Sequence, residues 1–178
     1  KYVGGPNSTG FIYGRKDLVD AIGLHSFIGV EAGPEEQSGY YRSIGRGYKL
    51  DRQEVIGVLV AFDEWFEIDH EKERFEPAWD KVHYIEKNIK DLPGLENARF
   101  YHYPRSGEGT GYHTIGLHVI LENMSIQETN KLVRKMREED PEVWVRNWGN
   151  SNDFIINCIN LKPGDEKLIV ERFTKIFS

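Results

Sequence analysis

TIGLHVIL, residues 114–121, is the stretch that decides the fold. Apolar side chains recur at every second position of it, at Ile115, Leu117, Val119 and Leu121. This is the period of a β-strand that buries one face. ARFYHY, residues 98–103, also has strand character, and the glycine-containing stretch PRSGEGTGY between the two is typical of a turn. We therefore expect two strands that follow each other closely.

The elements predicted after these strands alternate regularly. Ser125 and Glu128 have the spacing of a capping box, which predicts a helix that runs to about Glu138. Two more strands are predicted at 143–148 and 153–159, joined by a hairpin, and an amphipathic helix ends the chain. The order strand, strand, helix, strand, strand, helix predicts an α+β sheet with helices on one face.

The earlier part of the chain predicts fewer regular elements. GFIYG, residues 10–14, is a short apolar run between glycines and predicts a strand. A short helix is expected at 15–25, and the glycine-rich residues 29–48 are expected to form a loop.

Two helices are predicted between this loop and the sheet. The first begins at Asp51, with Glu54 three residues on, and it has apolar side chains on several faces, so we expect it to be well buried or to lie in an interface. The second, more charged helix is expected from about His70 to Lys90. Pro77 either kinks this helix or marks the start of its main part.

Composition indicates a globular protein. At 178 residues one domain is the default and two small lobes are the alternative. No apolar run approaches the ~20 residues that cross a bilayer, so we expect a soluble chain. Cys158 is the single cysteine and can form no internal disulfide, which fits a reducing cytoplasm. The chain begins with Lys and no signal peptide is visible, so we expect that it was processed or excised from a longer one.

Charge makes nucleic acid a poor first partner. The formal net charge is -6, and acidic and basic residues are interspersed along the chain. Binding to a phosphate backbone relies on clustered Lys and Arg, which this sequence does not have. We therefore expect no nucleic-acid partner for this chain alone.

Three stretches together resemble one protein family. They are KYVGGPNSTGFIYGRKDLV (1–19), IGRGYKLDRQEVIGVLVAFDEW (44–65) and the region from REEDPEVWVRNW to LIVERF (137–173). Each is similar to a segment of the selenocysteine-synthase-like group of fold-type-I pyridoxal-phosphate enzymes, in the same order and at similar spacing. Residues 67–112 are covered least. The group includes seryl-tRNA selenium transferase and ammonia-lyases that act on phosphorylated amino sugar acids such as glucosaminate 6-phosphate.

The resemblance implies an α/β enzyme of fold type I, of which this chain supplies mainly the small C-terminal α+β domain. In this interpretation residues 1–50 end the large cofactor domain, 51–90 form interdomain helices and 91–178 form the small domain. The cofactor would be pyridoxal 5'-phosphate, and a homodimer or higher homo-oligomer is expected.

The resemblance also implies site residues near the start of the chain. Lys1 matches the lysine that holds the cofactor and moves the substrate proton, for which it must be uncharged. The turn with Gly5, Asn7, Ser8 and Thr9 would contact the cofactor phosphate, in related dimers that of the neighbouring subunit. The alternatives are a solvated lysine and a purely structural turn.

Arg42 and Arg46 are the implied substrate-binding residues. Guanidinium groups suit bidentate recognition of a carboxylate or phosphate, and Arg46 matches the family's motif better than Arg42. The alternative is that both are simply solvated. The predicted reaction is abstraction of an α-proton followed by β-elimination from a small anionic, phosphorylated amino acid or amino sugar acid. Selenium transfer to seryl-tRNA, an aminotransferase or decarboxylase of the same fold, and a non-catalytic binding module are the alternatives.

Other reactive residue types predict no further site. His102, His113 and His118 have no obvious acidic co-ligand, so we expect no metal site. Cys158 falls on an apolar strand face and is expected in the core. Trp144, Arg146 and Trp148 share one face of a predicted strand and could line a groove, although core or interface packing is the simpler interpretation.

Overall fold

The computed structural model describes residues 3–25, 48–103 and 115–177. The chain divides into two compact units, Lys1–Ile68 and Asp69–Ser178. The three-part division into 1–50, 51–90 and 91–178 stays a prediction. Within the described ranges, no helix is both long and apolar enough to cross a membrane.

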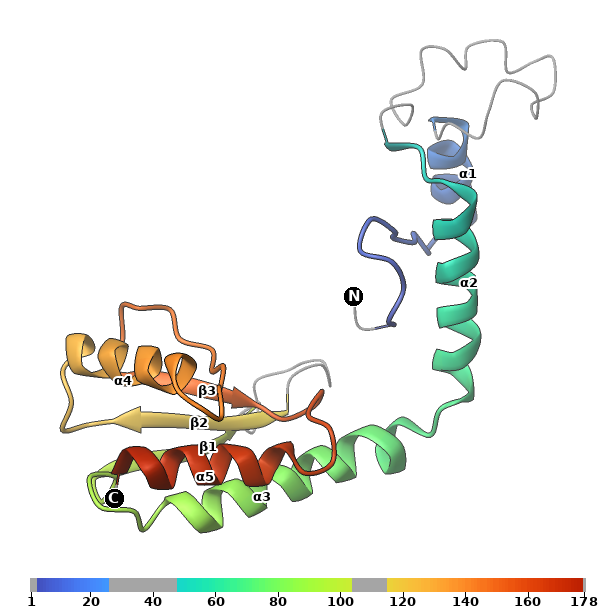
Figure 1. The fold of residues 1–178 in the computed structure, drawn as a ribbon. Helices are drawn as coiled ribbons and strands as arrows, with labels where there is room; N and C mark the ends of the chain where they lie inside the picture. Colours follow the sequence, from blue (N-terminus) through green and yellow to red (C-terminus); the bar gives the residue numbers. More distant parts are fainter. Residues whose placement is uncertain (1–2, 26–47, 104–114, 178) are drawn as a thin grey trace. The chain divides into compact units, whose positions relative to one another are not determined.

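The second unit contains a three-stranded antiparallel sheet in the order β1-β2-β3 (Figure 1). β1 is Ala98–Tyr103, β2 is Gly116–Leu121 and β3 is Asp153–Asn157. Phe100 pairs with Val119, which pairs in turn with Phe154, so these three residues share one face of the sheet. The prediction of strands in these three places is confirmed.

Four helical segments accompany this sheet: η4 (Glu71–Phe75), a π-helical turn, α3 (Glu76–Ile89), α4 (Ile126–Glu138) and α5 (Asp165–Phe177). Pro77 lies in the first turn of α3, directly after the π-helical turn η4, so it marks the start of the main part of this helix. The predicted capping box opens α4, because the Glu128 N–H bonds the Ser125 hydroxyl and the Ser125 N–H bonds the Glu128 carboxylate.

One hydrophobic core joins the helices to one face of the sheet. Every second residue of β2 belongs to it, and α3, α4 and α5 contribute Val82, Met136 and Phe173, all fully buried. Cys158 lies in the same core, as predicted. His118 and Ile120 point to the opposite face, because successive side chains of a strand alternate.

Residues 143–148 do not form the predicted strand. They make a single bridge to β3, between Arg146 and Ile155. The neighbouring backbone groups are bonded to α4 instead: the Val143 N–H donates to the Met136 carbonyl, and Arg137 donates to the Val145 carbonyl. A ladder cannot extend through groups that already have helical partners.

The first unit contains two described helices, α1 (Lys16–His25) and α2 (Arg52–Glu67). Both were predicted, and α2 begins with the expected capping box of Asp51 and Glu54. The strand predicted at 10–14 is wrong: these residues form no ladder with any described strand. Phe11 packs instead against Phe62 of α2, with ring centroids 4.6 Å apart.

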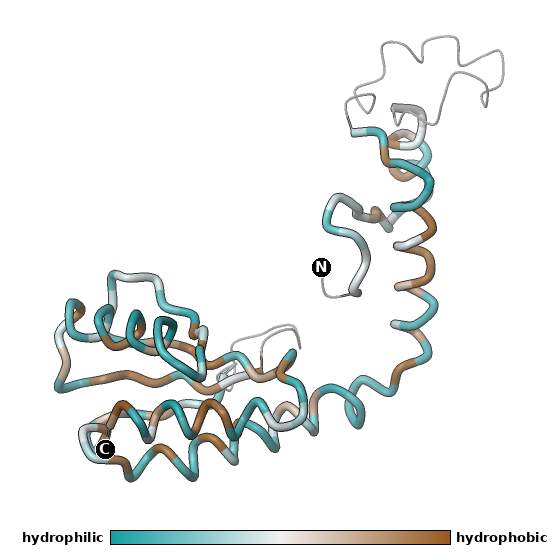
Figure 2. The backbone as a smooth tube through the Cα atoms, in the orientation of Figure 1, coloured by the Kyte–Doolittle hydropathy of each residue, from teal (hydrophilic) through white to brown (hydrophobic). Residues whose placement is uncertain are grey.

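α2 is apolar but not buried within the described residues. Ala61 is its one buried residue, and five large apolar side chains are exposed: Val55, Ile56, Leu59, Val60 and Phe66. The helix is correspondingly rich in hydrophobic positions in Figure 2. Burial of α2 is therefore not found in the described residues, and its place in an interface stays a prediction.

Candidate functional site

The turn that follows Lys1 is closed by its own backbone and by a threonine hydroxyl. Gly4 has φ +87°, a conformation that favours glycine. The Thr9 N–H donates to the Pro6 carbonyl at 3.0 Å, and the Thr9 hydroxyl donates to the same oxygen at 2.6 Å. Residues 6–9 are thus fixed by local bonds.

This turn lies against α2. A Cβ added to Gly57 would come within 3.0 Å of Pro6 Cγ, and one added to Gly5 within 3.3 Å of Val58 Cγ2. Both glycines therefore serve close packing between the turn and the helix. Gly5 was predicted to contact the cofactor, and that contact stays a prediction.

Glu54 joins the turn to the start of α2. Its carboxylate accepts a hydrogen bond from the Ser8 hydroxyl. The same carboxylate accepts from the Asp51 N–H at 3.4 Å, while the Glu54 N–H donates to Asp51 Oδ1 at 2.7 Å. The sequence identified Glu54 as a capping residue, but no sequence signal linked it to Ser8.

The arrangement decides which groups of the turn can bind an anion. A phosphate or carboxylate accepts hydrogen bonds, so it needs donors. The Ser8 and Thr9 hydroxyl protons are already donated to Glu54 and Pro6. Asn7 is exposed, and no described residue accepts from its amide or from its peptide N–H. The turn can therefore offer an anion the Asn7 amide and peptide N–H more readily than the Ser8 and Thr9 hydroxyls. The predicted cofactor contacts of Asn7, Ser8 and Thr9 all stay predictions.

The other predicted site residues lie outside the described part of the chain. These are Lys1, the cofactor lysine, and the two arginines proposed for substrate, Arg42 and Arg46. Their roles remain predictions from the resemblance.

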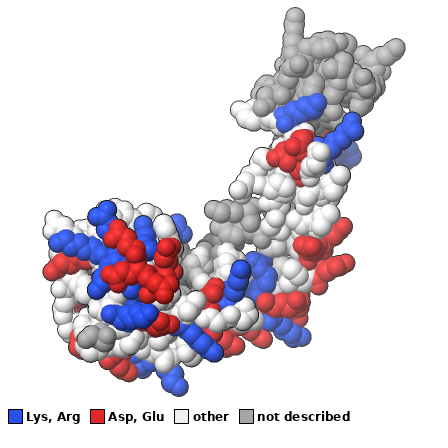
Figure 3. Space-filling model, viewed as in Figure 1, with Lys and Arg blue, Asp and Glu red and all other residues white. Residues whose placement is uncertain are grey.

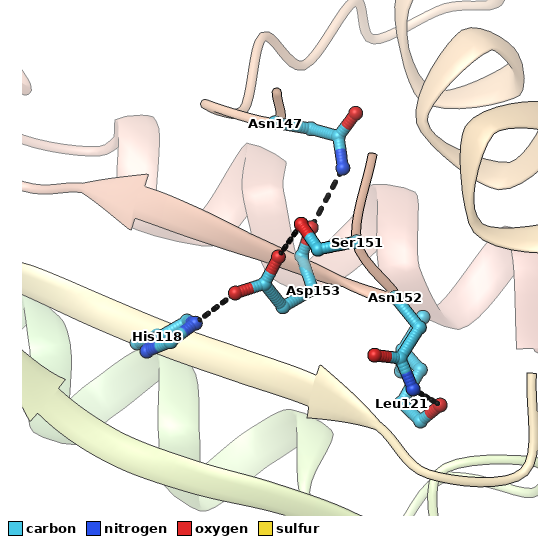
Figure 4. A network of polar contacts seen from close by, with 6 residues as sticks. All are labelled: His118, Leu121, Asn147, Ser151, Asn152 and Asp153. Carbon is cyan, nitrogen blue, oxygen red and sulfur yellow. Dashed lines mark hydrogen bonds and ion pairs between the residues drawn. The ribbon is translucent and has the colours of Figure 1, made fainter. Parts of the chain in front are cut away.

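A second polar cluster lies on the sheet face opposite the helices (Figure 4). His118 Nε2 is 2.6 Å from Asp153 Oδ2, and the Ser151 hydroxyl donates to the other oxygen of the same carboxylate. Burial raises the pKa of Asp153, but the hydrogen bonds from Ser151 and His118 outweigh this effect and lower the pKa below its ordinary value.

This cluster has the composition of a catalytic triad but not its connectivity. In a triad the hydroxyl bonds the imidazole, which bonds the carboxylate. Here Ser151 and His118 both bond Asp153, so no base is in place to activate the hydroxyl. The Asn147 amide donates to the Asp153 carbonyl at 2.7 Å, which ties the segment before β3 to the same point. The cluster holds β2, β3 and their connection together.

The described residues form neither a metal-binding cluster nor a reactive thiol. No group of three His, Cys, Asp or Glu side chains among the described residues is arranged to hold a metal ion. His113 lies outside them. Burial raises the pKa of the Cys158 thiol to about 12, which makes it a poor nucleophile.

Comparison with known proteins gives a fold likeness. No protein-family model matches the chain, and no curated protein matches it. A solved structure of D-glucosaminate-6-phosphate ammonia-lyase resembles it with a TM-score of 0.51 and 15% sequence identity. The match covers 79% of this chain and 36% of the ammonia-lyase chain, so the chain spans about a third of that enzyme's length. At this identity the likeness concerns the fold alone.

Proposed function

We propose that this chain is part of a pyridoxal-phosphate-dependent lyase of fold type I that acts on a small anionic amino acid or amino sugar acid. The observation that carries the proposal is the fold likeness to D-glucosaminate-6-phosphate ammonia-lyase over 79% of the chain. The motifs around Lys1, Arg46 and Asp140, chosen from the sequence alone, support the same family.

The distribution of charge supports a small substrate over tRNA. Figure 3 shows Lys and Arg interspersed with Asp and Glu on the face of the molecule that it draws. Exposed cations also pair locally with acids, as Lys16 does with Asp20 at 2.6 Å and Arg134 with Glu138 at 3.1 Å. Paired cations leave little charge for a phosphate backbone.

Each residue has a defined task in this proposal. Bound pyridoxal phosphate supplies an electron sink that stabilises a carbanion beside the substrate nitrogen. Lys1 holds the cofactor and, once released, takes the α-proton at its Nζ, which requires surroundings that keep the amine neutral. Arg46, with Arg42, binds the substrate anion. Asn7 donates to the cofactor phosphate, and Glu54, through Ser8, keeps the turn after Lys1 on α2.

The test uses the full-length protein, purified after growth with pyridoxine. We expect a visible absorption band, and reduction with borohydride should fix the cofactor to Lys1, which peptide mass spectrometry locates. Lys1→Ala should lose both signals, whereas Lys16→Ala should keep them, because Lys16 is exposed and bonded to Asp20. A cofactor fixed to another lysine, or none at all, contradicts the proposal. Ammonia release from D-glucosaminate 6-phosphate then tests the substrate class.

A further inference from the structure

A groove in the second unit lies between α4 and residues 142–149. Its volume is about 530 Å³, within the range typical of small-ligand pockets. From α4 it is lined by Asn130, Val133, Arg134, Arg137 and Glu138, and from the other side by Glu142, Trp144, Asn147, Trp148 and Gly149. We call it the Trp–Arg groove.

Two tryptophan side chains of this groove are largely exposed to solvent. Trp144 is 71% exposed and Trp148 is 57% exposed, although tryptophan is mostly buried in folded proteins. Each ring has a guanidinium over it: Arg137 lies 4.8 Å from the Trp144 centroid and Arg146 4.5 Å from that of Trp148. The stacking fixes both indoles without removing them from water.

Arg137 is a cation without an acidic partner. Arg134, its neighbour in the groove, pairs with Glu138, but no ion pair joins Arg137 to any described residue. Its Nη2 makes a long bond of 3.4 Å to the Val145 carbonyl, and its Nε is buried with no hydrogen-bond partner. A guanidinium has five N–H donors, and since the Nε donor is buried, the unused donors beside the groove are those of the two Nη groups.

Two asparagines of the lining shape the groove. The Asn130 amide donates to the Gly149 carbonyl at 3.0 Å, and Asn147 Oδ1 accepts from the Gly149 N–H at 2.9 Å. Gly149 has φ +79°, so these two asparagines hold a turn that favours glycine. These bonds hold the wall of the groove at Gly149 in place. Among the described lining residues, Arg137 is the cation that has no acidic partner.

The lining also restricts the charge of a ligand. Glu142 and the paired Glu138 lie at the groove, so a polyanion such as a nucleic-acid backbone would meet repulsion. A single carboxylate can pair with the remaining N–H donors of the two Nη groups of Arg137. The exposed indoles add flat apolar walls, which suit a planar ring.

We propose that the Trp–Arg groove binds a small organic acid that carries one carboxylate on a flat, apolar ring, with the carboxylate on Arg137 and the ring against Trp144 and Trp148. The site belongs entirely to the second unit. The site does not depend on the cofactor or on Lys1, so this proposal can be tested independently of the proposed enzymatic function.

The experiment titrates the full-length protein, labelled with 5-fluorotryptophan, with benzoate and follows the signals of Trp65, Trp79, Trp144 and Trp148 by fluorine NMR. Single Trp→Phe variants assign the signals. Benzoate should shift those of Trp144 and Trp148 with a Kd below ~1 mM and leave those of Trp65 and Trp79 in place. Benzamide keeps the ring without the charge, and acetate keeps the charge without the ring, so each should bind at least about tenfold more weakly.

Three variants test the assigned cation. Arg137→Gln should weaken benzoate binding about tenfold or more, and Arg137→Lys by less, since it keeps the charge but not the fork. Arg134→Gln should bind like the unaltered protein, because Arg134 is already paired. Equal binding of benzamide and benzoate, equal losses in Arg134→Gln and Arg137→Gln, or no saturable shift overturns the proposal. The ligand comparison on the unaltered protein decides it even if an Arg137 variant does not fold.

Discussion

The Ser8 hydroxyl donates to the carboxylate of Glu54, a residue 46 positions further along the chain. This contact connects the turn after Lys1 to the capping box of α2. The two features were predicted separately, one as part of a cofactor site and the other as a helix start. Their connection means that the geometry of the turn depends on the first turn of α2.

The first prediction is energetic coupling between Ser8 and Glu54. A hydrogen bond to a carboxylate contributes on the order of 1 kcal/mol at an exposed site, so a double-mutant cycle of Ser8→Ala and Glu54→Ala should give a coupling of that size in the free energy of unfolding. Urea titration measures it. The control cycle pairs Glu54→Ala with Lys16→Ala, which should be additive, because Lys16 bonds Asp20. Additivity in the Ser8 cycle would show that the contact contributes nothing.

The two helix starts show what local sequence can predict. Asp51 with Glu54, and Ser125 with Glu128, each satisfy backbone donors within three residues, and both capping boxes are present. Such signals need no distant partner. This explains why the starts of α2 and α4 were predicted correctly.

The two wrong strands show what local sequence leaves open. GFIYG is a short apolar run and VWVRNW is rich in Val and Trp, as many strands are. A β-strand, however, forms only where another strand pairs with it. Phe11 packs on α2 instead, and the backbone around Val143 and Val145 bonds α4. α2 is far from Phe11 in sequence, and although α4 directly precedes residues 143–148, its bonds to them depend on how the chain turns back after the helix. The period alone therefore could not exclude a strand.

The candidate site was predictable as a motif but not as a set of hydrogen bonds. Ser8 and Thr9 have the right composition for an anion site, and the sequence could not show that both hydroxyls donate within the chain. To know that the Ser8 hydroxyl already has an acceptor, one needs the position of Glu54, which only the folded structure shows. The exposed state of Trp144 was equally hidden, since tryptophan side chains are mostly buried in folded proteins.

The second prediction concerns Asp153 and acid. Because the pKa of Asp153 is lowered in the folded protein, its contribution to stability is present above the ordinary carboxyl pKa of 3.8 and is lost as pH falls through the folded value. Asp153→Asn should cost about 1–3 kcal/mol at neutral pH, and the difference from the unaltered protein should shrink below pH ~4. Urea unfolding at a series of pH values measures it. The exposed Asp91→Asn serves as control, and a difference that is constant with pH would contradict the assignment.

The third prediction concerns Gly116 in β2. A Cβ at this position would lie 2.3 Å from the Ile156 carbonyl oxygen, which is backbone of the neighbouring strand and cannot rotate away. Gly116→Ala must therefore separate β2 from β3, and we expect a loss of about 2–3 kcal/mol in the free energy of unfolding. Gly10→Ala is the matched control, because among the described residues no atom outside its chain neighbours lies within 4 Å of its added Cβ. An alanine at 116 that leaves stability unchanged would show that the strand pairing is different.

The fourth prediction is that Cys158 is unreactive in the folded protein. Its side chain is fully buried in the core, its N–H donates to the Ile115 carbonyl at 2.7 Å, and burial raises the thiol pKa to about 12. At pH 8 about one thiol in ten thousand would be ionised, and a reagent reaches it only when the core opens. Labelling with DTNB should therefore be slow in buffer and complete at once in concentrated urea, with one thiol per chain. Labelling in buffer as fast as in urea would place Cys158 outside the core and contradict the packing of β3 against β2.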